Sequence, residues 1–178
     1  MEAGHNRYLW NFQWDAGVMA APGRFTVKMT AGHIVQSRTF EVKIDPGVLK
    51  DGITQADLVE QQNFLLEGRQ AITDARRLQT RLQEAMQKGS VPVPPSPGAG
   101  EWVSNMTYQH PLQQLWARLV TAPGTYEQGM LIDQLSNIVR AESGGDQKIG
   151  AEARKRFDDL TTELKALEAE FSRAAGRV

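Results

Sequence analysis

The sequence FDDLTTELKALEAEF, residues Phe157 to Phe171, carries the clearest pattern in the chain. Its large apolar residues recur at alternating steps of three and four, at Phe157, Leu160, Leu164, Leu167 and Phe171. This spacing places them on one side of an α-helix, and such a seam packs lengthwise against another helix at a shallow angle. The pattern therefore predicts a C-terminal helix that packs along a long partner helix.

The expected partner is a helix over residues 54–88. Its apolar residues recur at steps of three, four or seven, at Leu58, Leu65, Ile72, Ala75, Leu78, Leu82 and Met86. Thr54, with Asp57 three residues later, predicts a capping box at the start, and Gly89 is suited to the C′ position just past the end. At about 1.5 Å per residue this helix is roughly 50 Å long, so it also needs a long partner.

Two further helices are expected between these long ones. One covers residues 127–142 and carries Met130, Leu131, Leu135, Ile138 and Val139. A shorter one carries Leu112, Leu115, Trp116, Leu119 and Val120, and the turn signal Ala122-Pro123-Gly124 separates the two. Residues 89–103 are rich in proline and glycine at their start, which predicts an extended linker that buries no core.

The first 47 residues have the period-two alternation of β-strands. Three strands are predicted, over Arg7–Trp14, Arg24–Thr30 and Thr39–Ile44, and the last two form an antiparallel hairpin around Ala31-Gly32-His33. In the first strand Trp10, Phe12 and Trp14 fall on one face. Three strands make no complete sandwich, since an immunoglobulin-like domain has about seven. We therefore expect this aromatic face to be covered by the helices, by upstream strands outside this chain, or by another subunit.

The composition excludes several classes of function. The chain has 178 residues, with 20 Lys and Arg against 21 Asp and Glu. This balance argues against a nucleic-acid surface, which needs a basic excess. Cysteine is absent, which excludes disulfides, zinc–thiolate sites and cysteine nucleophiles. The sequence contains no apolar run of about 18 residues, so no membrane-spanning helix is predicted. The first residues lack the pattern of a signal peptide.

A search for catalytic or metal-binding patterns assigns no residue. His5, His33 and His110 lie far apart, without the spacing of metal ligands. No serine lies in Gly-x-Ser-x-Gly, and no phosphate-binding glycine loop occurs. The carboxylates near the C-terminus are explained by ion pairs along a helix face, such as Arg154–Asp158 and Lys155–Asp159. No catalytic, cofactor-binding or metal residue is therefore predicted, and no cofactor is expected.

Two pairs of segments resemble one family. The segments Gly4–Asn11 and Ala20–Val27 resemble the Ig-like segment near the end of bacterial sortilin-like proteins, which are often labelled glycosyl hydrolases with Asp-box repeats. The segments Met130–Leu135 and Ala141–Gly150 are similar to the C-terminal helical region of the same family. The resemblance implies a periplasmic or extracellular location. It also implies that any hydrolase or sorting activity lies in a β-propeller that precedes these segments, and that the first Ig-like strands lie outside this chain.

The predicted fold class is α+β, with a small antiparallel sheet followed by an antiparallel helical bundle that contains a long helical hairpin. The expected parts are a partial Ig-like β unit (1–47), the long helix (48–88), the linker (89–103) and the remaining helices (104–178).

The expected function is a non-catalytic scaffold or protein–protein interaction module. Its candidate surface consists of five aromatic residues, Trp10, Phe12, Trp14, Trp102 and Tyr108. The expected partner is another protein or missing parts of a parent chain, with a second copy as a further alternative, and neither nucleic acid nor a membrane span is expected. The alternative function is an accessory carbohydrate-binding module of a secreted glycoside hydrolase, in which exposed tryptophans form a flat platform. The third possible function is a true hydrolase, which needs two carboxylates that converge in a cleft.

Overall fold

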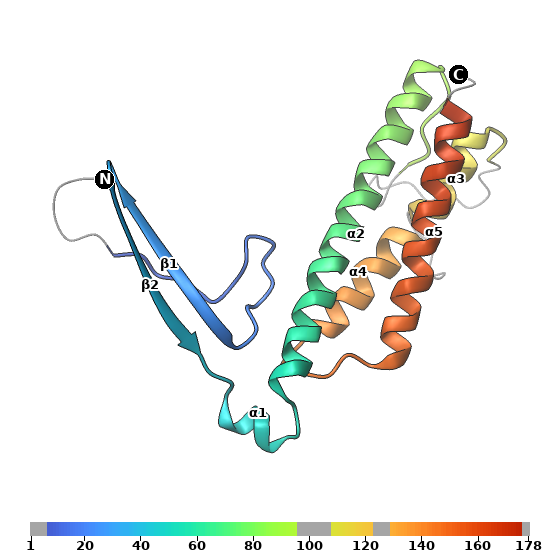
Figure 1. The fold of residues 1–178 in the computed structure, drawn as a ribbon. Coiled ribbons are helices and arrows are strands. Elements are labelled where there is room, and N and C mark those ends of the chain that lie inside the picture. The colour runs from blue at the N-terminus through green and yellow to red at the C-terminus, as the bar shows by residue number, and fades with distance from the viewer. Residues whose placement is uncertain (1–6, 96–107, 123–128, 176–178) are drawn as a thin grey trace. The chain divides into compact units, whose positions relative to one another are not determined.

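A computed structural model describes residues 7–95, 108–122 and 129–175 of the chain (Figure 1). The elements are β1 (Gly23–Ala31), β2 (Ile34–Val42), α1 (Pro46–Lys50), α2 (Gln55–Lys88), α3 (Pro111–Leu119), α4 (Leu131–Glu142) and α5 (Ala151–Ala175). The predicted α+β class is confirmed, since a two-stranded antiparallel sheet is followed by helices that include a long one.

The chain divides into two compact units, and the boundary falls within α2. The first unit comprises residues 1–66 and 145–148, which include the sheet, α1 and the start of α2. The second comprises residues 67–144 and 149–178, which include the rest of α2 with α3, α4 and α5.

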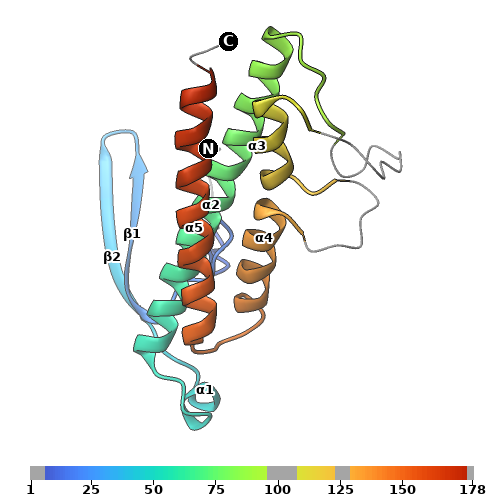
Figure 2. The same cartoon turned by 90° about the vertical axis from the view of Figure 1, so that its right-hand side faces the viewer.

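The core of the second unit is built on the heptad-like seam. All of its members are buried, and so are the residues that face inward from the other helices: Ala71, Ala75, Leu78, Leu82 and Met86 of α2, Leu112, Leu115, Trp116 and Leu119 of α3, and Leu131, Leu135 and Val139 of α4. Helices α3 and α4 both contact α5 and follow one another along its length (Figure 2). The spacing of three and four therefore located the buried side of these helices correctly.

The helix α4 begins later than the predicted start at residue 127. Its first residue is Leu131, and residues 127 and 128 lie outside the described ranges. The backbone N–H of Met130 donates to the hydroxyl of Thr121 at 2.8 Å, and this hydroxyl donates to Asp133 in the first turn. A side chain nine residues upstream thus supplies the cap that Met130 itself lacks.

The start of α2 is formed by the predicted capping box. The N–H of Asp57 donates to Oγ1 of Thr54 at 3.2 Å. In return, the N–H and the hydroxyl of Thr54 donate to Oδ2 of Asp57 at 2.7 and 2.6 Å. These reciprocal bonds satisfy backbone groups that the first turn of a helix leaves without partners.

This capping box makes the stability of the protein depend on pH. The pKa of Asp57 is lowered, first by the Thr54 hydroxyl, then by the Thr54 backbone N–H, and also by Lys148. A carboxyl whose pKa is lower in the folded state stabilises the protein above its unfolded pKa, and this stabilisation is lost as the pH falls through the folded pKa. Asp57→Asn is therefore expected to flatten the loss of stability between about pH 5 and pH 2. Urea denaturation midpoints across this range measure the effect, and parallel curves for variant and wild type would contradict it.

The end of α2 differs from the prediction. The left-handed residue is Ser90, with φ of 54°, whereas Gly89 is not left-handed. The N–H of Val91 donates to the carbonyl of Met86 at 2.8 Å, and that of Ser90 to Gln87 at 3.2 Å. These are the two bonds of a Schellman motif in which Ser90, and not Gly89, occupies C′. The helix continues one residue beyond the position that the glycine suggested.

Ser90→Gly is expected to stabilise the protein by about 1 kcal/mol, because glycine adopts the left-handed conformation without the strain of a Cβ. Urea denaturation checks this change, with Gly89→Ala as the comparison. If Ser90→Gly is neutral or destabilising, the C′ assignment is wrong.

The prediction of three strands is wrong. Residues 7–14 form no strand, and their one ladder contact is an isolated bridge between Gln13 and Met19. Phe12 has a φ of 58°, a conformation that an extended strand does not contain. The chain then reverses through Gly17, where the N–H of Trp14 donates to the carbonyl of Val18 at 2.9 Å. The alternating aromatic residues of this segment, which predicted a strand, therefore lie in irregular structure.

The predicted hairpin is confirmed, with a shifted second strand. β1 pairs with β2 in antiparallel register, from Gly23 opposite Val42 to Ala31 opposite Ile34. The turn consists of Gly32, with φ of 57°, and His33. Glycine at the first position of a two-residue turn matches the right-handed twist of the strands. After the hairpin, Asp45 caps the short helix α1, which the sequence pattern did not predict.

Candidate interaction surface

The two faces of the hairpin differ in polarity. The register places Phe25, Val27 and Met29 of β1 on the same side as their partners Phe40, Arg38 and Gln36. We define the apolar face of the hairpin as Phe25, Val27, Met29, Ile34, Phe40 and Val42. The opposite, polar face consists of Arg24, Thr26, Lys28 and Thr30 of β1 with Glu41, Thr39, Ser37 and Val35 of β2.

An aromatic cluster covers the half of the apolar face near the start of β1. The ring of Trp10 lies 5.1 Å from that of Phe25, 5.9 Å from Phe40 and 5.0 Å from Phe12, between centroids. Phe25 and Phe40 stack at 6.0 Å across the ladder. The indole N–H of Trp10 donates to the carbonyl of Gln13 at 3.0 Å. The cover of this sheet is therefore the chain's own irregular N-terminal segment, which was not among the three expected covers.

Glutamine side chains in the first turns of α2 form hydrogen bonds with the same segment. Oε1 of Gln62 accepts from the indole N–H of Trp14 at 3.0 Å and from the N–H of Ala21 at 2.7 Å. Nε2 of Gln55 donates to the carbonyl of Pro22 at 2.9 Å. Sequence reasoning did not find these glutamines, because polar residues on an amphipathic helix usually face solvent.

The other half of the apolar face is open. Val27 and Met29 each expose 50% of their surface and Ile34 exposes 51%. Contiguous exposed apolar side chains are candidates for an interaction surface, whereas scattered ones are ordinary on a protein surface. Among the described residues, no backbone hydrogen bond joins residues 24–41 to any segment outside the hairpin. A two-stranded hairpin is at best marginally stable alone in water, so covering this half would stabilise it further.

The hairpin is also positively charged. Its two strands contain the cations Arg24, Lys28 and Arg38 and one carboxylate, Glu41, which lies opposite Arg24. None of these three cations forms an ion pair with a described residue. In the second unit, by contrast, Arg118 pairs with Glu170 at 2.8 Å. The net charge of the two strands is therefore basic.

The five aromatic residues proposed from the sequence do not form one surface in the described structure. Trp10, Phe12 and Trp14 contribute to the aromatic cluster, where Phe12 and Trp14 remain 45% and 43% exposed. Trp102 lies outside the described residues. Tyr108 belongs to the second unit and precedes α3, where its carbonyl accepts from Gln114 at 3.3 Å. The open residues Val27, Met29 and Ile34 were absent from that list, although the alternation of β1 places the first two on one face.

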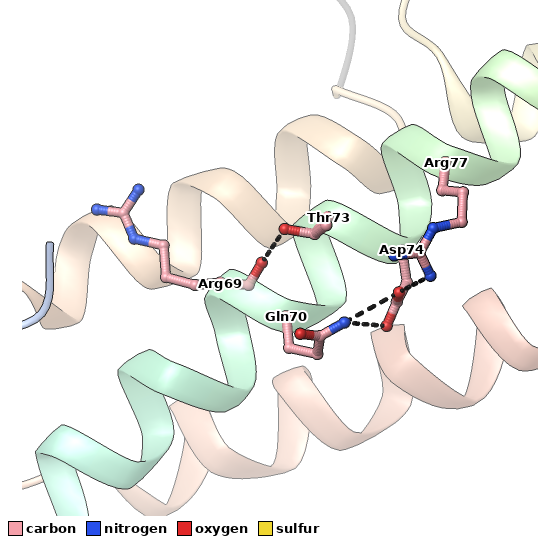
Figure 3. Close-up of polar contacts among 5 residues, drawn as sticks. All are labelled: Arg69, Gln70, Thr73, Asp74 and Arg77. Carbon is pink, nitrogen blue, oxygen red and sulfur yellow. Dashed lines mark hydrogen bonds and ion pairs between the residues drawn. The ribbon is translucent and has the colours of Figure 1, made fainter. Parts of the chain in front are cut away.

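Polar groups on the helices pair both within one helix and between helices. On α2, Asp74 accepts from Nε2 of Gln70 at 3.0 Å and from Arg77 at 2.8 Å (Figure 3). Lys155 pairs with Asp159 at 3.2 Å as predicted, and Arg154 donates to Glu67 of α2 at 2.7 Å. In the part of the chain that is described, no three His, Asp or Glu side chains gather as a metal site would need. Within the same residues, no helix has the length and apolar character to cross a membrane.

Comparison of the chain with protein-family models, with curated proteins and with solved structures finds no match. The function is therefore inferred from the exposure and the charge of the hairpin.

Proposed function

We propose that the chain is a non-catalytic scaffold or protein–protein interaction module, and that the open half of the apolar face is its binding surface. The observation that carries this proposal is the half-exposure of Val27, Met29 and Ile34 side by side on one face of a two-stranded sheet. Covering the exposed half of each side chain would contribute about 1 kcal/mol. Together the three side chains would contribute about 3 kcal/mol to a contact that backbone hydrogen bonds also support.

The family resemblance supports a wider context for this proposal. The resemblance to sortilin-like proteins implies a partial Ig-like segment followed by a helical region, and a small sheet followed by helices agrees with that order. We propose that the chain is the C-terminal part of such a bacterial protein or a subunit of a larger assembly, in the periplasm or outside the cell. Its partner is then another protein or another part of the parent chain.

The alternative of a carbohydrate-binding module has one observation in its favour, the partial exposure of Phe12 and Trp14. A sugar-stacking platform needs an open, flat aromatic face. Trp14, however, is tilted by 49° against Phe25 and donates its indole N–H to Gln62. This alternative predicts glycan binding that Trp14→Ala abolishes without unfolding the protein, and a glycan array with both proteins decides it.

The proposed function is tested with a variant that makes the open half polar. The triple substitution Val27→Thr, Met29→Thr, Ile34→Thr retains strand-forming residues while removing apolar surface. The matched control is Val35→Thr, because Val35 is 54% exposed but lies on the polar face. Selection from a displayed peptide library is expected to enrich ligands with the wild type and the control, and to fail with the triple variant. Equal enrichment by all three proteins, or by none, would refute the proposal.

A further inference from the structure

We propose that the outer edge of β1 receives a strand from an acidic partner protein, which extends the hairpin to a three-stranded sheet. This inference rests on the proposed function and names the chemistry of the partner. A strand added to an exposed edge gains main-chain hydrogen bonds, and its alternate side chains provide specificity.

The side-chain pattern selects β1 as the edge that receives the strand. Every second residue of β1 is apolar on one face, at Phe25, Val27 and Met29. β2 interrupts its own apolar row with the polar residues Gln36 and Arg38. Because cross-strand neighbours on one face stabilise a sheet, an incoming strand with alternating apolar residues finds a continuous apolar row beside β1 alone.

The open backbone favours a strand over a lipid surface. Each strand of a two-stranded ladder directs half of its N–H and C=O groups away from its partner. Among the described residues, no backbone group outside the hairpin satisfies those of β1. A bilayer offers no hydrogen bonds to such groups, so burying the edge in lipid would leave them unsatisfied. An incoming strand pairs with them directly.

The charge of the hairpin defines the other face of the incoming strand. Arg24 and Lys28 alternate with threonines on the polar face of β1, and neither forms an ion pair with a described residue. Acidic side chains at the polar positions of a partner strand would lie opposite them. Two antiparallel copies of β1 paired about Thr26 would instead bring Arg24 against Lys28, which destabilises a ladder, and in other registers these cations gain no opposite charge. The occupant is therefore an acidic strand and not another hairpin of this chain.

Peptides of nine residues, the length of β1, test this inference against the full chain. The first probe alternates valine and glutamate. The second replaces each glutamate with lysine, and the third contains the composition of the first in shuffled order. Affinity is measured by fluorescence anisotropy, and the exchange of backbone amides with solvent is followed by NMR. Binding to vesicles of phosphatidylserine is measured as a test of a lipid surface as the occupant. Sedimentation of the protein alone measures self-association.

The valine–glutamate peptide is expected to bind at least about tenfold more tightly than either comparison peptide. It should also slow exchange of the β1 amides that do not donate to β2. Binding is expected to weaken as salt rises, because exposed charges are screened. The double variant Arg24→Gln, Lys28→Gln should weaken binding about fivefold or more. Lys43→Gln, which removes an exposed charge beyond the end of β2, should leave it unchanged.

Several results would overturn the inference. They are equal binding of the glutamate and lysine peptides, protection of β2 amides in place of β1 amides, self-association that depends on Val27 and Met29, or binding to vesicles without binding to peptide. If library selection finds ligands that depend on the apolar face while the valine–glutamate peptide fails, only this inference is refuted. If selection finds no such ligand, the proposed function itself is refuted.

Discussion

Trp10→Ala is expected to lower the local stability of the hairpin by about 2 to 4 kcal/mol, because it removes a large aromatic side chain from the apolar face. The Trp10 ring lies within 6 Å, between centroids, of three phenylalanine rings. Phe25 belongs to β1, Phe40 to β2 and Phe12 to the N-terminal segment. Loss of the Trp10 ring uncovers Phe40 and leaves Phe25 in contact with the more distant ring of Trp14, at 6.2 Å between centroids. Hydrogen exchange of the β1 and β2 amides measures the effect, which should appear as faster exchange along the whole ladder.

The control for this prediction is Tyr8→Ala. Tyr8 is also aromatic and lies two residues upstream, but 84% of its surface is exposed, so its removal should change stability by less than about 0.5 kcal/mol. Trp10→Phe should retain most of the ladder protection because it keeps a ring over the strands. Unchanged exchange in Trp10→Ala would mean that something other than the N-terminal segment covers this half of the sheet.

Gly68→Ala is expected to destabilise the second unit by about 1 to 3 kcal/mol, the cost of inserting a group into a packed core. Gly68 lies inside α2, where alanine normally stabilises a helix by about 1 kcal/mol relative to glycine. A Cβ at this position would lie 2.3 Å from Cγ2 of Val139 on α4. Val139 is buried, and a valine in a helix is held in one χ1 rotamer. The methyl group therefore yields only if α4 moves.

The background variant Val139→Ala reverses the sign of this effect. The Cβ of residue 139 would lie 3.6 Å from the new Cβ at residue 68, which is ordinary contact. In that background Gly68→Ala should become stabilising through helix propensity. Urea denaturation of the four proteins gives the coupling between the two positions. Additive changes in free energy would show that α2 and α4 do not meet at this pair.

The helices were predictable because periodicity reports directly on a buried side. The seam from Phe157 to Phe171 and the capping box of Thr54 and Asp57 depend on residues within one helix, so spacing alone locates them. The C′ position of α2 was mistaken because glycine is the usual left-handed residue there, yet Ser90 adopts this conformation in the structure.

The irregular segment before β1 was not predictable in the same way. Alternating aromatics are typical of a strand, but the left-handed Phe12 and the reversal at Gly17 redirect the chain. This reversal depends on long-range contacts, such as those of Gln62 with Trp14 and Ala21. Alternation in β1 indicated that one face is apolar. It contained no information on how much of that face Trp10 covers, and the candidate surface depends on the part left open.

The affinity of a library-selected peptide for three proteins tests the central claim most directly: the wild type, the variant with threonine at residues 27, 29 and 34, and Val35→Thr. If the open half of the apolar face is the binding surface, the triple variant should bind at least about tenfold more weakly, while Val35→Thr stays within about twofold of the wild type. Equal affinity of all three proteins, with the hairpin still folded, would contradict the claim.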